Sequence, residues 1–352
     1  MSSSPLVLVT GGTSFIAKWV LAILLQDAQN YVVRTTLRNT SRTGEIHASL
    51  SEAGVPDERI KSLQTVQADL SSDAGWDEAM KDVTYVLHVA SPVPGGVPND
   101  ENELILPAVE GTKRVLRAAR DAGAKRVVLT SSISAVWHGK ANEDKRAFDE
   151  NDWTDLSDPD PRLLSIYPKA KTLAERAAWE FIEQEGNGME LVSINPVNVL
   201  GPCLGKDDAT CLRTVSELLL GNVPGFPRTH WCLVDVRDCA TLHVLAMTHP
   251  KAAGERFICM GEGALWMSEI GALLKDKLGD RANKVPRFVL PDFLLKIIAI
   301  FMPVAKLVVP DLGVARVVNC DKAKSVLGWE WKYTSEEAVL AAAESWMKYN
   351  QS

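Results

Sequence analysis

The fold is decided close to the start of the chain, by Leu6-Val7-Leu8-Val9-Thr10-Gly11-Gly12-Thr13-Ser14-Phe15-Ile16-Ala17. Four consecutive apolar residues predict a short strand that is buried on both faces. The glycines predict a tight turn, and the residues from Lys18 to Gln26 have an amphipathic helical pattern. A strand, a glycine turn and a helix in this order are typical of a dinucleotide-binding fold, because backbone N–H groups at a helix N-terminus attract a pyrophosphate.

The spacing of this motif is Gly-x-x-Ser-x-x-Ala, which is looser than the Gly-x-Gly-x-x-Gly of many dinucleotide sites. Gly11 would form the turn, and Ala17 is small enough for close packing of helix on strand. The hydroxyl of Ser14 must then fit beside the phosphate or bond to it. For this motif alone, a plain glycine turn remains the alternative.

Further apolar runs predict strands at residues 31–37, 63–68, 85–89 and 126–130, with helices at 76–81, at 102–122 and from Tyr167 onward. Repeated β-α units imply parallel strands joined by helical crossovers. The sequence therefore predicts an α/β fold with a doubly wound parallel Rossmann sheet.

The residue that ends the second predicted strand is Arg38. At this place an acidic residue binds a free ribose 2′-hydroxyl, whereas an arginine suits a 2′-phosphate. Arg38 therefore indicates NADPH, with Arg42 as a second contact; two solvated arginines are the alternative. Asp69, which closes the third strand, can reach the amino group of an adenine.

Tyr167 and Lys171 are four residues apart, so on a helix their side chains share one face. An adjacent ammonium lowers the pKa of a phenol, which would make Tyr167 a proton donor near neutral pH. Ser131 and Ser132 follow the strand 126–130 at the same edge of the sheet. A hydroxyl, a phenol and an ammonium would thus converge on one crevice, although a Tyr-x-x-x-Lys pair alone also occurs by chance.

Composition excludes several classes of function. The chain has 352 residues and a net charge of −7, without a basic run, which argues against nucleic-acid binding. Its beginning does not resemble a signal peptide, and its six cysteines are scattered, so we expect reduced thiols, no metal site and a cytoplasmic protein.

The apolar segment from Phe293 to Val309 contains two lysines and Pro303. It predicts a buried or lid helix, with a membrane-surface contact as the alternative, and no membrane span.

These motifs together resemble the extended short-chain dehydrogenase/reductase family, and within it the dihydroflavonol 4-reductase-like branch, which includes methylglyoxal and ketone reductases. The resemblance runs from Leu6 to about Trp346 and includes Thr10–Ala17, Asp69-Leu70, His88–Pro92, Glu103–Thr112, Thr130–Ser132, Tyr167–Lys171 with Ala174–Trp179, Asn195-Pro196, Gly201-Pro202 and Val234–Asp238. It implies that Ser132, rather than Ser131, acts with Tyr167 and Lys171 in catalysis. Ser14 departs from the family's usual middle glycine.

The resemblance also implies which residues would hold NADPH: Gly11, Thr13, Ser14, Phe15, Ile16, Arg38, Arg42, Asp69, Leu70, Val89, Ala90, Ser91, Tyr167, Lys171, Pro196 and Val199. Residues 191–194 and 256–259 would be further strands. Residues 5–197 and 232–262 would form the dinucleotide-binding domain, and residues 198–231 and 263–347 a smaller substrate-binding domain. Around the substrate pocket, Trp137, Phe226 and Trp231 do not identify the substrate.

The expected function is reduction of a small ketone or aldehyde to an alcohol by a monomer or homodimer. A nucleotide-sugar epimerase or dehydratase of the same fold is one alternative. It needs a clamp for a nucleotide diphosphate, and the segment 198–231 has only Lys206, Arg213, Arg228 and His230 for that purpose. A non-catalytic NADP(H)-sensing regulator is the other alternative, but such a protein has no need of the Tyr167/Lys171 pair.

Overall fold

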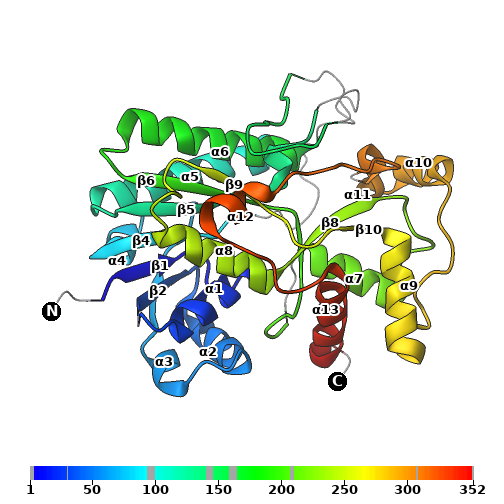
Figure 1. Ribbon diagram of the computed structural model, residues 1–352, viewed down its shortest axis with the longest axis horizontal. Helices are drawn as coiled ribbons and strands as arrows, with labels where there is room; N and C mark the ends of the chain where they lie inside the picture. Colours follow the sequence, from blue (N-terminus) through cyan, green and yellow to red (C-terminus); the bar gives the residue numbers. More distant parts are fainter. Residues whose placement is uncertain are drawn as a thin grey trace.

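The computed structural model describes residues 4–29, 31–92, 100–139, 146–157, 165–206, 210–306 and 308–350, with the backbone alone for residues 210, 211, 303 and 304. At its centre is a seven-stranded sheet in the order β3-β2-β1-β4-β5-β6-β9 (Figure 1). Every neighbouring pair in this sheet is parallel. The strands are β1 (Leu6–Val9), β2 (Val32–Leu37), β3 (Gln64–Gln67), β4 (Val83–His88), β5 (Arg126–Thr130), β6 (Glu190–Pro196) and β9 (Arg256–Cys259).

The side chains of β1 show why its sequence is uniformly apolar. Val7 and Val9 belong to one buried cluster, and Leu6 and Leu8 belong to another on the opposite face of the sheet. Helices α1 (Phe15–Gln26), α2 (Thr43–Glu52), α3 (Asp57–Lys61), α8 (Val236–Thr248) and α12 (Asp321–Leu327) contribute to the first cluster, and α4 (Trp76–Met80), α5 (Asn102–Asp121) and α6 (Ile166–Glu185) to the second. The sheet is therefore doubly wound, as predicted.

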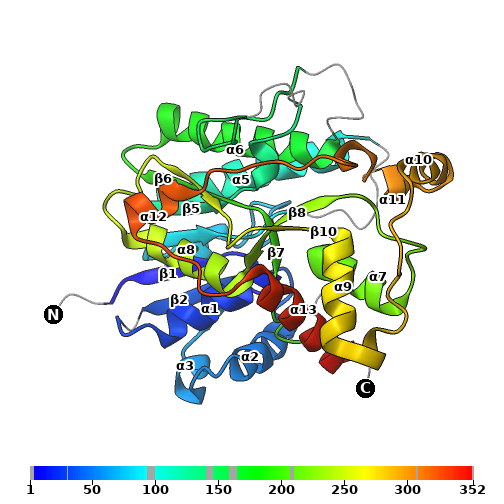
Figure 2. The same ribbon diagram turned by 45° about the vertical axis from the view of Figure 1, so that its right-hand side comes forward.

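A smaller sheet has the order β10-β8-β7, with β7 (Asn198–Leu200) parallel and β10 (Ala264–Trp266) antiparallel to β8 (His230–Asp235). The helices near it are α7 (Thr210–Leu220), α9 (Met267–Leu278), α10 (Asp292–Phe301), α11 (Pro303–Lys306) and α13 (Ser335–Asn350). They lie at the end of the molecule opposite the N-terminus (Figure 2). The short 3-10 helices are η1 (Thr40–Arg42), η2 (Ile133–Ala135), η3 (Gly279–Ala282) and η4 (Val309–Asp311).

The predicted strands are present, and those at residues 126–130 and 256–259 have the predicted bounds. The predicted start of the first helix at Lys18 was wrong. Ser14 already has the extended backbone of an N-cap residue, with φ −79° and ψ 156°, so the first turn of α1 begins at Phe15. This places the backbone N–H groups of the first turn directly after the glycine turn.

A buried or lid helix was expected between Phe293 and Val309, and the first of these alternatives, a buried helix, was wrong. This stretch contains α10 and α11, and Ala299 is the only buried residue of α10. Among the residues that the structure describes, no helix is both long and apolar enough to span a bilayer. The proline- and glycine-rich stretch 92–98 predicts a pocket-lining loop at this edge of the sheet, and residues 93–99 lie outside the described ranges.

Candidate active site

The turn between β1 and α1 has the backbone geometry that a pyrophosphate needs. Gly11 has φ +70°, and a Cβ at this position would lie 2.9 Å from the Cβ of Ala90. A Cβ on Gly12 would lie 2.4 Å from Oγ1 of Thr35, so the chain passes directly over β2 and β4. The first turn of α1 has no acidic residue, and the side chain of Ser14 forms no capping hydrogen bond. The helix N-terminus is therefore suited to an anion, and Ser14 does not obstruct it.

The two arginines that were predicted to bind a 2′-phosphate both follow β2, but their surroundings differ. Arg38 is exposed and forms no ion pair with any described residue. The guanidinium of Arg42 instead donates two hydrogen bonds to Glu45, at 2.8 and 2.9 Å. The carboxylate of Asp69 accepts hydrogen bonds from Ser71, and these bonds, with a smaller effect of Arg38, lower its pKa. Arg38 is thus available to a ligand, whereas Arg42 already has a partner.

The end of β4 is held by a buried hydroxyl. Oγ1 of Thr10 lies 2.9 Å from Nδ1 of His88 and accepts a hydrogen bond from the backbone N–H of Ala90 at 3.0 Å. Burial, and then the charge of Lys171, lower the pKa of His88 to about 3, so this histidine is neutral. His88 is a core residue with a hydrogen-bond partner, and it fixes the backbone that leads into Ala90 and Ser91.

Tyr167 and Lys171 lie in the first turns of α6, after the N-cap residue Ser165. The side chain of Tyr167 is 43% exposed, whereas Lys171 is only 9% exposed. Nζ of Lys171 donates to the backbone oxygen of Thr130 at 3.4 Å, at the end of β5. Burial lowers the pKa of Lys171 to about 8, against the opposing effect of Glu175. The ammonium is therefore directed into the protein, one helical turn from an exposed tyrosine.

The two serines after β5 have different partners. The hydroxyl of Ser131 donates to Oε2 of Glu175 at 2.6 Å. Oγ of Ser132 accepts a hydrogen bond from the N–H of Ser134 at 3.1 Å, as the N-cap of η2, which packs against α6. The O–H of Ser132 has no acceptor among the described residues, so it can donate to a substrate. This arrangement favours the prediction of Ser132 over Ser131.

Sequence reasoning missed the role of Glu175, whose side chain is fully buried one helical turn after Lys171. Its carboxylate also accepts hydrogen bonds from Nδ2 of Asn195 at 2.8 Å and from Nε of Arg256 at 2.7 Å. The only available signal was an acidic residue four positions from Lys171. A cavity of about 20 Å³, room for about one water molecule, lies beside Lys171, Ser131 and Glu175.

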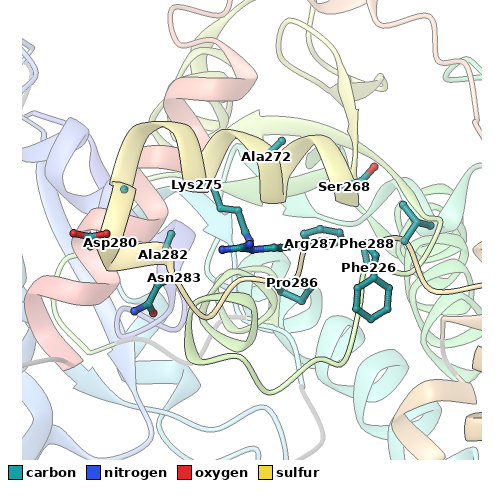
Figure 3. A pocket seen from close by; sticks show the side chains of 12 residues that line it. Phe226, Ser268, Ala272, Lys275, Asp280, Ala282, Asn283, Pro286, Arg287 and Phe288 are labelled. Carbon is teal, nitrogen blue, oxygen red and sulfur yellow. The ribbon is translucent and has the colours of Figure 1, made fainter.

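Some of the other predicted residues lie near the ends of β6 and β7 or after η2, and Phe226 lies in a separate cavity. Pro196 ends β6 and Val199 lies in β7, both buried, on the side of the crevice opposite the glycine turn. Trp137 is buried just after η2. Phe226, in contrast, lines a cavity of about 460 Å³ beside α9, together with Lys275 and Arg287 (Figure 3). This larger cavity contains none of the predicted catalytic residues.

The chain is similar to several known proteins. The chain matches the NAD dependent epimerase/dehydratase family over residues 7–259. Tetraketide alpha-pyrone reductase 2 of Arabidopsis thaliana is 38% identical over 277 residues, covering 77% of this chain and 82% of that protein. Cinnamoyl-CoA reductase 1 of Petunia hybrida is 36% identical over 274 residues, covering 77% of each chain.

The crystal structure of yeast methylglyoxal/isovaleraldehyde reductase Gre2 complexed with NADPH is similar over 98% of this chain and 99% of that one, with a TM-score of 0.78 and 25% identity. Dihydroflavonol 4-reductases are also among the relatives. The resemblance inferred from the motifs is therefore confirmed. The chain belongs to the NAD dependent epimerase/dehydratase family, as an NAD(P)-dependent oxidoreductase of the extended short-chain dehydrogenase/reductase type.

Proposed function

We propose that this protein is an NADPH-dependent carbonyl reductase that converts a ketone or aldehyde into an alcohol. The observation that carries the proposal is the contrast between two side chains one helical turn apart. Tyr167 is 43% exposed, whereas Lys171 is 9% exposed and directed at the end of β5. An accessible phenol beside a buried ammonium is the arrangement that general acid catalysis by tyrosine requires.

Bound NADPH would supply the hydride from C4 of its nicotinamide. The N–H groups at the start of α1 would hold its pyrophosphate, and the turn at Gly11 allows close approach. Arg38 would bind the 2′-phosphate and Asp69 the adenine. The ends of β4, β6 and β7, with Val89–Ser91, Pro196 and Val199, would lie against the nicotinamide half. Apart from Val199, which lies in the smaller sheet, these groups lie at the carboxyl edge of the seven-stranded sheet, which is where such ligands bind.

Side chains of the protein would donate the proton to the substrate. Tyr167 and Ser132 donate hydrogen bonds to the carbonyl oxygen of the substrate, and Tyr167 transfers its proton as negative charge develops there. Lys171 stabilises the phenolate that remains. Because its pKa is held at about 8, Lys171 is still largely charged at neutral pH and can fulfil this role.

We infer the substrate class from the relatives and propose that the segments 198–231 and 263–347 bind it. The names of two relatives refer to a tetraketide pyrone and a cinnamoyl thioester, so we expect a conjugated or aromatic carbonyl compound to be reduced better than a small aliphatic one. A nucleotide sugar fits less well. Arg213 lies 3.8 Å from Glu217, and Arg228 is paired with Asp292 at 2.5 Å, so two of the basic residues that could clamp a diphosphate are engaged.

The test is oxidation of NADPH, followed by absorbance, with methylglyoxal, a bulky aryl ketone, a β-keto ester, a diketone and a dihydroflavonol. We expect turnover with at least one member of this panel and formation of the alcohol. Assays with a nucleotide diphosphate sugar and NAD⁺, at the same protein concentration, serve as the control for the epimerase reaction. Turnover in the control set alone would contradict the proposal.

A further inference from the structure

Helix α10 exposes an unusually apolar surface. Phe301, Ile300, Phe293 and Ile297 are 80%, 68%, 67% and 48% exposed. At 100° per residue, these four positions and Leu294 form one continuous arc of the helix, and the buried Ala299 lies opposite its centre. In both views α10 and α11 project from the end of the molecule opposite the N-terminus (Figures 1 and 2). The apolar arc therefore faces away from the body of the protein.

The apolar surface continues upstream of the helix. Phe288 and Val289 are 57% and 44% exposed, and they line the cavity beside α9. Downstream, Met302 is 55% exposed. Contiguous apolar patches of this kind are rare on monomeric proteins and mark surfaces that bind a partner or a membrane. The apolar face comprises Phe288, Val289, Phe293, Leu294, Ile297, Ile300, Phe301 and Met302.

The apolar face has a cationic rim. Lys296 on α10 is exposed at the edge of the arc, and Lys306 on α11 is exposed beyond it. Lys275 and Arg287 lie close together in the cavity beside α9 (Figure 3), where desolvation, and then the charge of Arg287, lower the pKa of Lys275. Within the part of the chain that the structure describes, none of these four cations forms an ion pair.

Acidic side chains are sparse on this surface: Asp280 lines the cavity beside α9, and none follows Asp292 in α10 or α11. The stretch 293–306 contains no aspartate or glutamate, and Asp292 at its start is paired with Arg228. This local excess of positive charge contrasts with the net charge of −7 for the whole chain. Apolar side chains bordered by unpaired cations are complementary to a lipid surface with anionic headgroups.

We propose that the apolar face docks on an anionic membrane surface. The aromatic and aliphatic side chains of α10 enter the boundary between headgroups and acyl chains, and the rim cations contact the lipid phosphates. A second copy of the chain is a poorer occupant, because a two-fold contact through α10 would place Lys296 of one copy near the same cationic rim of the other. This inference does not depend on the reaction proposed above.

The experiment is sedimentation of the full-length protein with vesicles of phosphatidylcholine alone, or with about one third phosphatidylserine, at low and high salt. The wild type should bind the anionic vesicles at least about tenfold more strongly than the neutral ones, and salt should weaken that binding. An Ile300→Glu/Phe301→Glu variant should lose binding at least about tenfold. A Lys296→Gln/Arg287→Gln variant should lose only the preference for anionic vesicles.

Val32→Glu is the control for an added glutamate, because Val32 is an apolar residue that is 38% exposed on β2, far from α10; it adds one negative charge where the double variant adds two. It should bind vesicles like the wild type. Unfolding in urea checks that each variant is folded. The proposal would be overturned if the wild type failed to bind anionic vesicles, or if Ile300→Glu/Phe301→Glu bound them equally well. It would also be overturned if light scattering showed that these changes dissolve a dimer while no form of the protein binds vesicles.

Discussion

Nε of Arg256 donates a hydrogen bond to Oε1 of Glu175 at 2.7 Å, and both side chains are buried. The other carboxylate oxygen accepts from Ser131 at 2.6 Å and from Asn195 at 2.8 Å. Glu175 therefore ties the ends of β5 and β6 and the start of β9 to α6, the helix that carries Tyr167. The alignment of the proposed catalytic groups depends on this buried carboxylate.

Arg256→Met should be strongly destabilising, because it leaves the charge of Glu175 without its partner. Breaking a buried ion pair on one side typically costs about 3–5 kcal/mol. Unfolding in urea measures the loss. Adding Glu175→Gln to Arg256→Met should restore part of this stability, since the carboxylate that lost its arginine partner is then removed as well. Arg120→Met, in a surface pair with Glu185 whose side chains are 19% and 54% exposed, is the control and should cost much less, about 1 kcal/mol. Equal losses for Arg256→Met and Arg120→Met would contradict this view of the pair.

Ser132→Ala and Ser131→Ala should differ in what they damage. Ser132→Ala removes a donor to the carbonyl oxygen and should lower kcat by about 100-fold or more with little effect on stability. Ser131→Ala removes a buried hydrogen bond to Glu175 and should cost about 1–3 kcal/mol of stability, with a smaller effect on kcat. Steady-state kinetics and urea unfolding of both variants separate the roles. The reverse pattern would mean that Ser131 is the serine that faces the substrate.

Lys171→Met should stabilise the protein at neutral pH. Burial lowers the pKa of Lys171 to about 8, from 10.5 in the unfolded chain. Below pH 8 the lysine is charged in both states, and the folded state bears the cost of burying it. Between about pH 8 and pH 10.5 the lysine is protonated in the unfolded chain and largely neutral in the folded protein, so the free energy of unfolding of the wild type rises with pH. The difference of 2.5 between the two values corresponds to up to about 3 kcal/mol.

Urea unfolding of the wild type and Lys171→Met at several values from about pH 7 to 10 measures this effect. The free energy of unfolding of Lys171→Met should exceed that of the wild type at pH 7, and the difference should become smaller above pH 8. A constant difference between the two proteins across this range would show that Lys171 does not titrate as expected.

The sequence predicted the sheet and the Tyr167/Lys171 pair because both depend on local patterns. Apolar runs and glycine turns define the strands, and a spacing of four residues defines a helix face. The network of Glu175 was not predictable in this way, because its partner Arg256 is 81 residues away in the sequence. The exposure of α10 was missed for another reason: an apolar composition ordinarily indicates burial, and only the packing of its neighbours determines whether a helix is covered.

Arg38→Ala tests the choice of cofactor. A 2′-phosphate can accept two charge-assisted hydrogen bonds from a guanidinium, each contributing roughly 1.5–3 kcal/mol. The wild type should therefore prefer NADPH over NADH by at least about tenfold in kcat/KM. Arg38→Ala should raise KM for NADPH and hardly change that for NADH. Arg42→Ala should have a weaker effect, because Glu45 already holds that guanidinium. Equal use of both cofactors by the wild type would contradict the role of Arg38.

The central claim is that Tyr167 donates the proton to a carbonyl oxygen. The most direct test compares the wild type with Tyr167→Phe, using NADPH oxidation with the best carbonyl substrate of the panel and NADPH binding by fluorescence. Because only the phenolic hydroxyl is removed, the dissociation constant for NADPH should stay within about twofold, while kcat should fall by about 100-fold or more. A Tyr167→Phe enzyme that kept more than about a tenth of the wild-type kcat would contradict the account.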